Sequence, residues 1–125
     1  MTRQRLSELL DAFVAAWNAH DPAALMACMV PGGGTFHASA GPAPDGVTYD
    51  GKKAVRTAYE AILTAFPDAE WHDAAHIIDG DRAVTTWRFT ATRPDGSRVD
   101  VRGCDVFKLH DGLLAVKDTF RKHIV

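Results

Sequence analysis

The chain has 125 residues, of which 46% are hydrophobic and 24% charged, and its formal net charge is −2. This length fits one domain, residues 1–125, and this composition is typical of a folded soluble protein rather than a disordered chain. Because the basic residues are scattered and no apolar run could cross a bilayer, neither nucleic-acid nor membrane binding is indicated.

The N-terminus and the cysteines indicate the compartment. The first ten residues lack the apolar centre of a secretory signal peptide, so we expect a cytoplasmic protein. Cys28 and Cys104 are the only cysteines, and they do not form a CxxC pair. Two free thiols are therefore expected, rather than a disulfide or a metal site.

The first predicted element is a helix that begins near residue 5 and ends between Asn18 and His20. Its apolar side chains repeat at helical spacing and form one stripe, made of Leu6, Leu9, Leu10, Phe13, Val14 and Trp17. Asp21 and Pro22 favour an N-cap and a first helical turn, so they predict a second, short helix over residues 22–29.

The middle of the chain predicts a strand, a loop and another helix. Pro31 and three consecutive glycines stop the short helix, and residues 35–40 suit a short strand. Residues 41–51 are rich in turn formers and predict a loop. Residues 52–66 again show helical spacing, and Pro67 ends that helix.

After Pro67 the hydrophobic period changes to two. The segments that suit strands are residues 70–78, 82–93, 97–109 and 113–124. The short sequences DGD, PDG and HDG between them favour tight turns, so consecutive strands should pair antiparallel as a four-stranded meander. Helices followed by an antiparallel sheet define an α+β fold, and we expect a half-open cone with the helices on its concave side.

Asp105 interrupts an apolar strand face. Alternation along a strand gives Asp105 the same face as Val101, Gly103, Phe107 and Leu109. An ionised carboxylate is costly to bury without a partner, so either it reaches solvent at a strand end or bulge, or this face lines a cavity. We favour the cavity, where burial would raise the pKa of the carboxyl and let a neutral acid donate to a developing oxyanion.

Two further residues are candidate proton carriers. Asp118 would share a face with Leu114, Val116 and Phe120, so it either enters the same cavity or forms a surface ion pair. His37 lies in the strand where a proton carrier is expected, and histidine is a common general acid or base, but it points outward if its strand neighbour Phe36 points inward. The remaining histidines show no metal-ligand spacing.

Three segments carry a resemblance to a protein family. They are AAWNAHDPAAL (15–25), YDGKKAVRTAYEAI (49–62) and GCDVFKLHDGLLAVKDTF (103–120). With the order of elements, they resemble the nuclear transport factor 2-like superfamily, in its SnoaL-like and ketosteroid-isomerase-like branches. The resemblance implies a cone-shaped, cystatin-like roll with an apolar pocket, no metal or organic cofactor, and often a homodimer formed through the outer face of the sheet.

The same resemblance implies roles for particular residues. Asp105 occupies the position of the neutral acid of ketosteroid isomerases, whereas Phe13 replaces their oxyanion-hole tyrosine and the general base is missing near Ala38. Asp118 resembles an aspartate of the epoxide hydrolases that works with an arginine, here Arg88. Their second aspartate would fall near Thr90, where none is present.

Two hypotheses for function follow. The first is a cofactor-independent isomerase, aldol-type cyclase, dehydratase or epoxide hydrolase that acts on a small apolar molecule through Asp105, Asp118 and His37. Its pocket would be lined by Phe13, Trp17, Tyr59, Trp87, Arg88, Phe107 and Phe120. The second is a non-catalytic module of the same fold that binds a small ligand or a protein.

Overall fold

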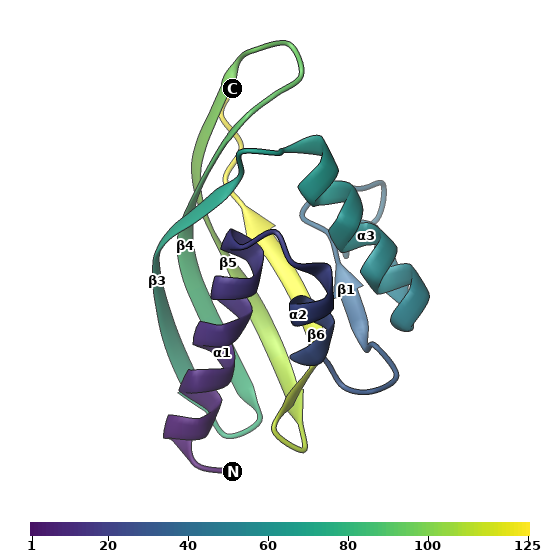
Figure 1. The fold of residues 1–125 in the computed structure, drawn as a ribbon, viewed down its shortest axis with the longest axis vertical. Coiled ribbons are helices and arrows are strands. Elements are labelled where there is room, and N and C mark those ends of the chain that lie inside the picture. The colour runs from purple at the N-terminus through teal and green to yellow at the C-terminus, as the bar shows by residue number, and fades with distance from the viewer.

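The structure, a computed structural model, describes all residues from Met1 to Val125 as three helices and six strands. The helices are α1 (Arg3–Asn18), α2 (Pro22–Ala27) and α3 (Lys52–Ala65). The strands are β1 (Thr35–His37), β2 (Thr48–Asp50), β3 (Glu70–Asp79), β4 (Arg82–Thr92), β5 (Arg98–His110) and β6 (Leu113–Arg121). The three helices cover one face of a single curved sheet, which confirms the predicted α+β class (Figure 1).

Local chemistry accounts for the ends of the helices. The Thr2 side chain accepts a hydrogen bond from the Arg5 amide and caps α1, and Asp21 caps α2 directly before Pro22, as predicted. The predicted stripe on α1 faces the sheet, with Leu6, Leu10 and Phe13 buried. None of the three helices could span a bilayer, because none combines the necessary length with the necessary hydropathy.

The sheet is larger than the predicted meander. Its strand order is β2-β1-β6-β5-β4-β3, in which β3 to β6 form the expected antiparallel meander. Strand β1 adds to the edge of β6 in parallel, and β2 pairs antiparallel with β1. The prediction of a continuous loop over residues 41–51 is therefore wrong at its end, because Thr48–Asp50 hydrogen-bonds with β1 as an edge strand. Three residues carry too little alternation to identify a strand from the sequence.

Two β-bulges interrupt otherwise regular pairing. The register between β3 and β4 shifts between His72 and Ala75, where Asp73 adopts a positive φ of 57°. A second shift falls in β6, where Leu114 and Val116 pair with consecutive residues of β5, so Ala115 is the extra residue. Each bulge bends its strand and reverses which residues face inward beyond it.

The core consists of two apolar clusters on the concave side of the sheet. The larger one joins all three helices to β1, β4, β5 and β6, and contains Phe13, Tyr59 and Phe107. The smaller one lies toward the β4–β5 hairpin and contains Trp87 and Phe89. Trp71 packs against both clusters. The two clusters do not fill the cone completely, and the remaining space between them is the candidate site.

Candidate functional site

An apolar cavity of about 190 Å³ lies where the two core clusters meet. Its lining combines aromatic and aliphatic side chains from both clusters with a few polar groups, and consists of Trp17, Phe36, Ala38, Ser39, Ala40, Ile62, Phe66, Trp71, Trp87, Phe89, Lys117, Thr119 and Arg121. Mostly apolar walls with a few convergent polar groups are characteristic of small-molecule sites. The only titratable side chains in this lining are Lys117 and Arg121.

Asp105 points inward, as its position on β5 predicted, but it lies one layer behind the cavity surface. The residue is buried, with an exposed fraction of 6%. One carboxylate oxygen accepts a hydrogen bond from Trp87 Nε1 at 3.0 Å, and the other accepts one from Thr119 Oγ1 at 2.7 Å. The same second oxygen forms an ion pair of 3.2 Å with Lys117 Nζ.

All three partners of Asp105 line the cavity, whereas Asp105 itself does not. Because every one of these partners donates a hydrogen or carries positive charge, the arrangement suits an ionised carboxylate that only accepts. This geometry therefore does not favour the expected role of Asp105 as a neutral acid that donates a hydrogen bond to the ligand. Asp105 instead holds the donors of the cavity wall in place.

Of the two charged groups that line the cavity, Lys117 is the buried one. It is buried to an exposed fraction of 4%, and its Nζ donates to Thr119 Oγ1 at 2.7 Å besides pairing with Asp105. An ammonium group has three N–H donors, so one of them is left without a protein acceptor. Burial lowers the pKa of Lys117, and the nearby Asp105 carboxylate opposes that effect.

Aromatic rings surround the ammonium group of Lys117. Its Nζ lies 4.5 Å from the centre of the Phe36 ring, 5.2 Å from that of Trp17 and 5.7 Å from that of Tyr59. Such distances permit cation–π attraction, which offsets part of the cost of burying the charge. The cation is thus fixed by a carboxylate on one side and by aromatic faces on the other.

Because of the bulge at Ala115, Lys117 points into the cone, and two residues that were predicted to face the pocket lie on the outer face of the sheet. Without a bulge, Asp118 and Phe120 would share the inward face of Leu114, as the sequence indicated. The extra residue reverses the alternation, so that Lys117 and Thr119 point into the cone. The expected orientation of Asp118 and Phe120 is therefore wrong, and Phe120 is 54% exposed on the outer face.

His37 and Arg88 also lie on the outer face. Phe36 is the buried residue of β1, so its neighbour His37 points away from the cavity and contacts Thr48 Oγ1 at 2.8 Å. His37 is also the register partner of Asp118 across the β1–β6 pairing. Arg88 forms a two-pronged ion pair with Asp100, with both contacts at 2.7 Å, so its prediction as a pocket residue is wrong.

The remaining predicted pocket residues divide between wall and core. Trp17 and Trp87 line the cavity, whereas Phe13, Tyr59 and Phe107 are fully packed beside it. Burial, followed by the charge on Asp105, raises the pKa of Tyr59 well above its usual value, so this phenol stays protonated. The indole N–H of Trp17 is buried and has no hydrogen-bond acceptor in the structure.

Lys117, Thr119 and Arg121 were not identified as pocket residues from the sequence. Lysine is among the residue types least often buried, and a regular strand would have directed all three toward solvent. The sequence did indicate that Lys117 and Thr119 lie on the same face of their strand, because they are two residues apart and must share a face in any register. No group of three or more His, Cys, Asp or Glu side chains is arranged to hold a metal ion.

Comparison with other proteins defines the class. The SnoaL-like domain family matches residues 10–116, which is most of the chain, so the protein belongs to that family. It is a member of the nuclear transport factor 2-like superfamily with a cystatin-like roll, as the resemblance implied. No curated protein matches the chain.

Several solved structures share this fold. A proposed polyketide cyclase of Xanthomonas campestris pv. campestris superposes with a TM-score of 0.82 at 18% identity, covering 94% of this chain and 90% of that one. A nuclear transport factor 2-like protein of unknown function from Mesorhizobium loti has a TM-score of 0.76 at 28% identity, with 96% and 93% covered. A Xanthomonas campestris protein with a cystatin-like fold has a TM-score of 0.80 at 18% identity, with 94% and 91% covered.

Proposed function

We propose that this SnoaL-like protein is a cofactor-independent enzyme for a small, largely apolar molecule that carries a carbonyl or epoxide oxygen. The observation that carries the proposal is Lys117, a buried cation at an aromatic cavity, held by Asp105 and Thr119 with one N–H free of protein acceptors. The reaction belongs to the isomerase, aldol-type cyclase, dehydratase or epoxide hydrolase classes, in each of which negative charge develops on a substrate oxygen.

Lys117 has the chemical properties that this role needs. A cation fixed in a dry site stabilises a developing oxyanion more strongly than the same cation in water, because it need not reorganise during the reaction. Its lowered pKa also brings it closer to the range in which an amine exchanges protons. Asp105 acts as a positioning residue, since it reaches the cavity only through Lys117, Thr119 and Trp87.

The proposal is tested by exchange of α-protons for deuterium. We expect the protein to accelerate this exchange for some members of a panel of small cyclic ketones in D₂O, followed by proton NMR. Lys117→Met should lower the accelerated rate by about 100-fold or more, the range typical of a lost oxyanion donor or proton carrier. The matched control is Lys108→Met, because Lys108 is exposed on the same sheet.

Two other outcomes would count against the proposal, the first against the role of Lys117 and the second against catalysis. An exchange rate that Lys117→Met leaves unchanged would remove Lys117 from the mechanism. Ketones that shift the fluorescence of Trp17, Trp71 and Trp87 without exchanging protons would instead support the non-catalytic binding module, since these indoles line the cavity.

We also propose that the outer face of the sheet forms a homodimer. Ile77, Val84 and Val106 are register partners in one row across β3, β4 and β5, and Cys104 and Phe120 form a pair in the neighbouring row. Ile77 is 66% exposed and Phe120 54% exposed, although both are large apolar side chains. An apolar patch of this kind on a sheet face favours self-association.

Sedimentation equilibrium tests the dimer. The wild-type chain is expected to sediment at twice its mass of 13.6 kDa, and Phe120→Glu is expected to sediment as a monomer because like charges would meet in the apolar interface. Ile124→Glu is the control, since Ile124 is exposed beyond the end of β6. A wild-type monomer, or a Phe120→Glu dimer of unchanged strength, would contradict the proposed interface.

A further inference from the structure

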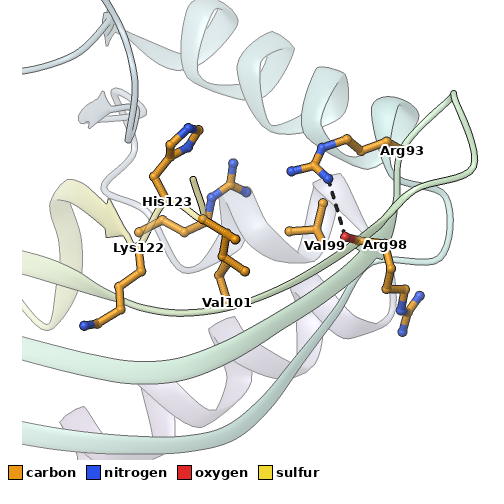
Figure 2. Close-up of a pocket in the computed structure, with 8 residues that line it drawn as sticks. Arg93, Arg98, Val99, Val101, Lys122 and His123 are labelled. Atoms are coloured by element: carbon orange, nitrogen blue, oxygen red, sulfur yellow. Dashed lines mark hydrogen bonds between the residues drawn. The ribbon is translucent and has the colours of Figure 1, made fainter.

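A groove of about 140 Å³ lies beside the cavity, between the end of β6 and the β4–β5 hairpin. Its lining is rich in cationic side chains and contains no acidic one, and consists of Arg93, Arg98, Val99, Val101, Arg121, Lys122, His123 and Ile124. Figure 2 shows the Arg93 side chain extending over Val99, whereas the Arg98 side chain turns away from the groove. A concave surface lined by one sign of charge concentrates counter-ions.

The two hairpin arginines differ in how well they are neutralised. Arg98 is paired with the Asp68 carboxylate at 3.2 Å, so its charge is already compensated. Arg93 donates only to neutral oxygens, Ser97 Oγ and the Arg98 carbonyl, each at 3.4 Å. Figure 2 shows the contact with the Arg98 carbonyl. These contacts are long for hydrogen bonds, and neither supplies negative charge. Arg93 therefore lines the groove without forming an ion pair, although the Asp95 carboxylate in the same turn interacts with its charge.

Arg121 connects the groove to the cavity, because it lines both. Its guanidinium carbon lies 5.2 Å from the centre of the Phe89 ring, which itself belongs to the cavity wall. Arg121 forms no ion pair or side-chain hydrogen bond, unlike Arg88 and Arg98 on the same sheet. Burial, followed by the charge of Arg93, lowers the pKa of Arg121, and both arginines line the same groove.

We infer that Arg121, assisted by Arg93, binds a carboxylate on the substrate while the substrate's ring occupies the aromatic cavity. The inference rests on the proposed function, since it uses the same cavity, and it narrows the substrate class to small ring-bearing carboxylic acids. A planar guanidinium matches a carboxylate with two parallel hydrogen bonds, and stacking on Phe89 fixes its orientation. The cavity volume of about 190 Å³ suits one six-membered ring, since an apolar cavity of about 150 Å³ accepts benzene.

The orientation of such a ligand follows from the two ends of the cavity. Lys117 lies among Phe36, Trp17 and Tyr59, while Arg121 lies over Phe89 at the side of the groove. A carboxylate at Arg121 therefore leaves a second oxygen of the same molecule to meet the free N–H of Lys117. The carboxylate serves as an anchor, and the reacting oxygen is the one at Lys117.

Binding of phenylacetate and phenylacetamide, measured by isothermal titration calorimetry, tests the inference. The two probes share a ring and a shape but differ in charge. Wild-type protein is expected to bind the acid about tenfold or more tightly than the amide, as a charge-assisted hydrogen bond implies. Arg121→Gln should reduce this preference to about threefold or less without weakening the amide, and Arg93→Gln should reduce it in part.

Arg82→Gln is the matched control, because Arg82 is exposed at the opposite end of β4 and should leave the preference unchanged. Equal affinities for acid and amide in the wild type would overturn the carboxylate anchor while leaving the cavity and the proposed function intact. A preference that survives Arg121→Gln would also overturn it, since the acid would then be bound by Lys117 or elsewhere. Failure of both probes to bind would overturn the anchor together with the ring-binding cavity.

Discussion

Lys117→Met is expected to destabilise the protein by about 3–5 kcal/mol, the cost typical of leaving one member of a buried ion pair without its partner. Asp105 would then remain buried with only the Trp87 and Thr119 donors. Asp105→Asn should also be strongly destabilising, because it leaves the Lys117 ammonium buried among aromatic rings without a counter-charge. The free energy of unfolding in urea, at one fixed pH, measures both effects.

The double variant Lys117→Met/Asp105→Asn is expected to recover much of the lost stability. Replacing both members of a buried pair removes the cost of desolvating two charges, so the result is often close to neutral. The double-mutant cycle should therefore give a large coupling free energy between positions 105 and 117. This cycle also separates stability from function, since the double variant should fold without accelerating exchange.

Arg88 and Asp100 provide the matched cycle. They form a closer, two-pronged ion pair, with both contacts at 2.7 Å, between neighbouring strands of the same sheet. Their side chains are 46% and 49% exposed, so water screens the attraction and the coupling should be much smaller. A coupling free energy between positions 105 and 117 that is no larger than the one between positions 88 and 100 would contradict a buried ion pair at Asp105 and Lys117.

Gly103→Ala is expected to have the next largest effect, destabilising the protein by about 1–3 kcal/mol through overpacking. Gly103 is the register partner of Trp87, and a Cβ atom there would lie 2.6 Å from Cη2 of the indole and meet the Phe120 carbonyl oxygen. The ring must then move, which disturbs its 3.0 Å hydrogen bond to Asp105 and one wall of the cavity. Urea unfolding gives the loss of stability, and the near-ultraviolet circular dichroism of the tryptophans reports the displaced ring.

Gly32→Ala is the control for this substitution. No atom lies within 4 Å of a Cβ placed on Gly32, and its backbone is not in the left-handed region, so alanine should be tolerated there. Equal stability of the two variants would mean that the Trp87 ring does not depend on the absence of a side chain at residue 103.

The sequence predicted the helices and the long strands because each depends on local, repeated patterns. The stripe on α1, the Asp21–Pro22 start of α2 and the Pro67 stop after α3 all lie where helical spacing and capping chemistry placed them. Regular pairing between β4 and β5 preserves strict alternation, so the inward direction of Asp105 followed from the sequence as well.

The tertiary structure decided which polar group reaches the cavity. Leu114 at the start of β6 exchanges backbone hydrogen bonds with Cys28 and Val30, and the strand then continues beside β1. The bulge at Ala115 lies at this change of partner, and one extra residue turned Lys117 inward and Asp118 outward. Pairing with segments some 80 residues away cannot be predicted from the alternation of apolar residues, because that alternation depends only on neighbours along the same strand. Local patterns along the chain therefore specified the helices, the four-stranded meander and the inward-facing acid, whereas long-range strand pairing specified the lysine that this acid holds.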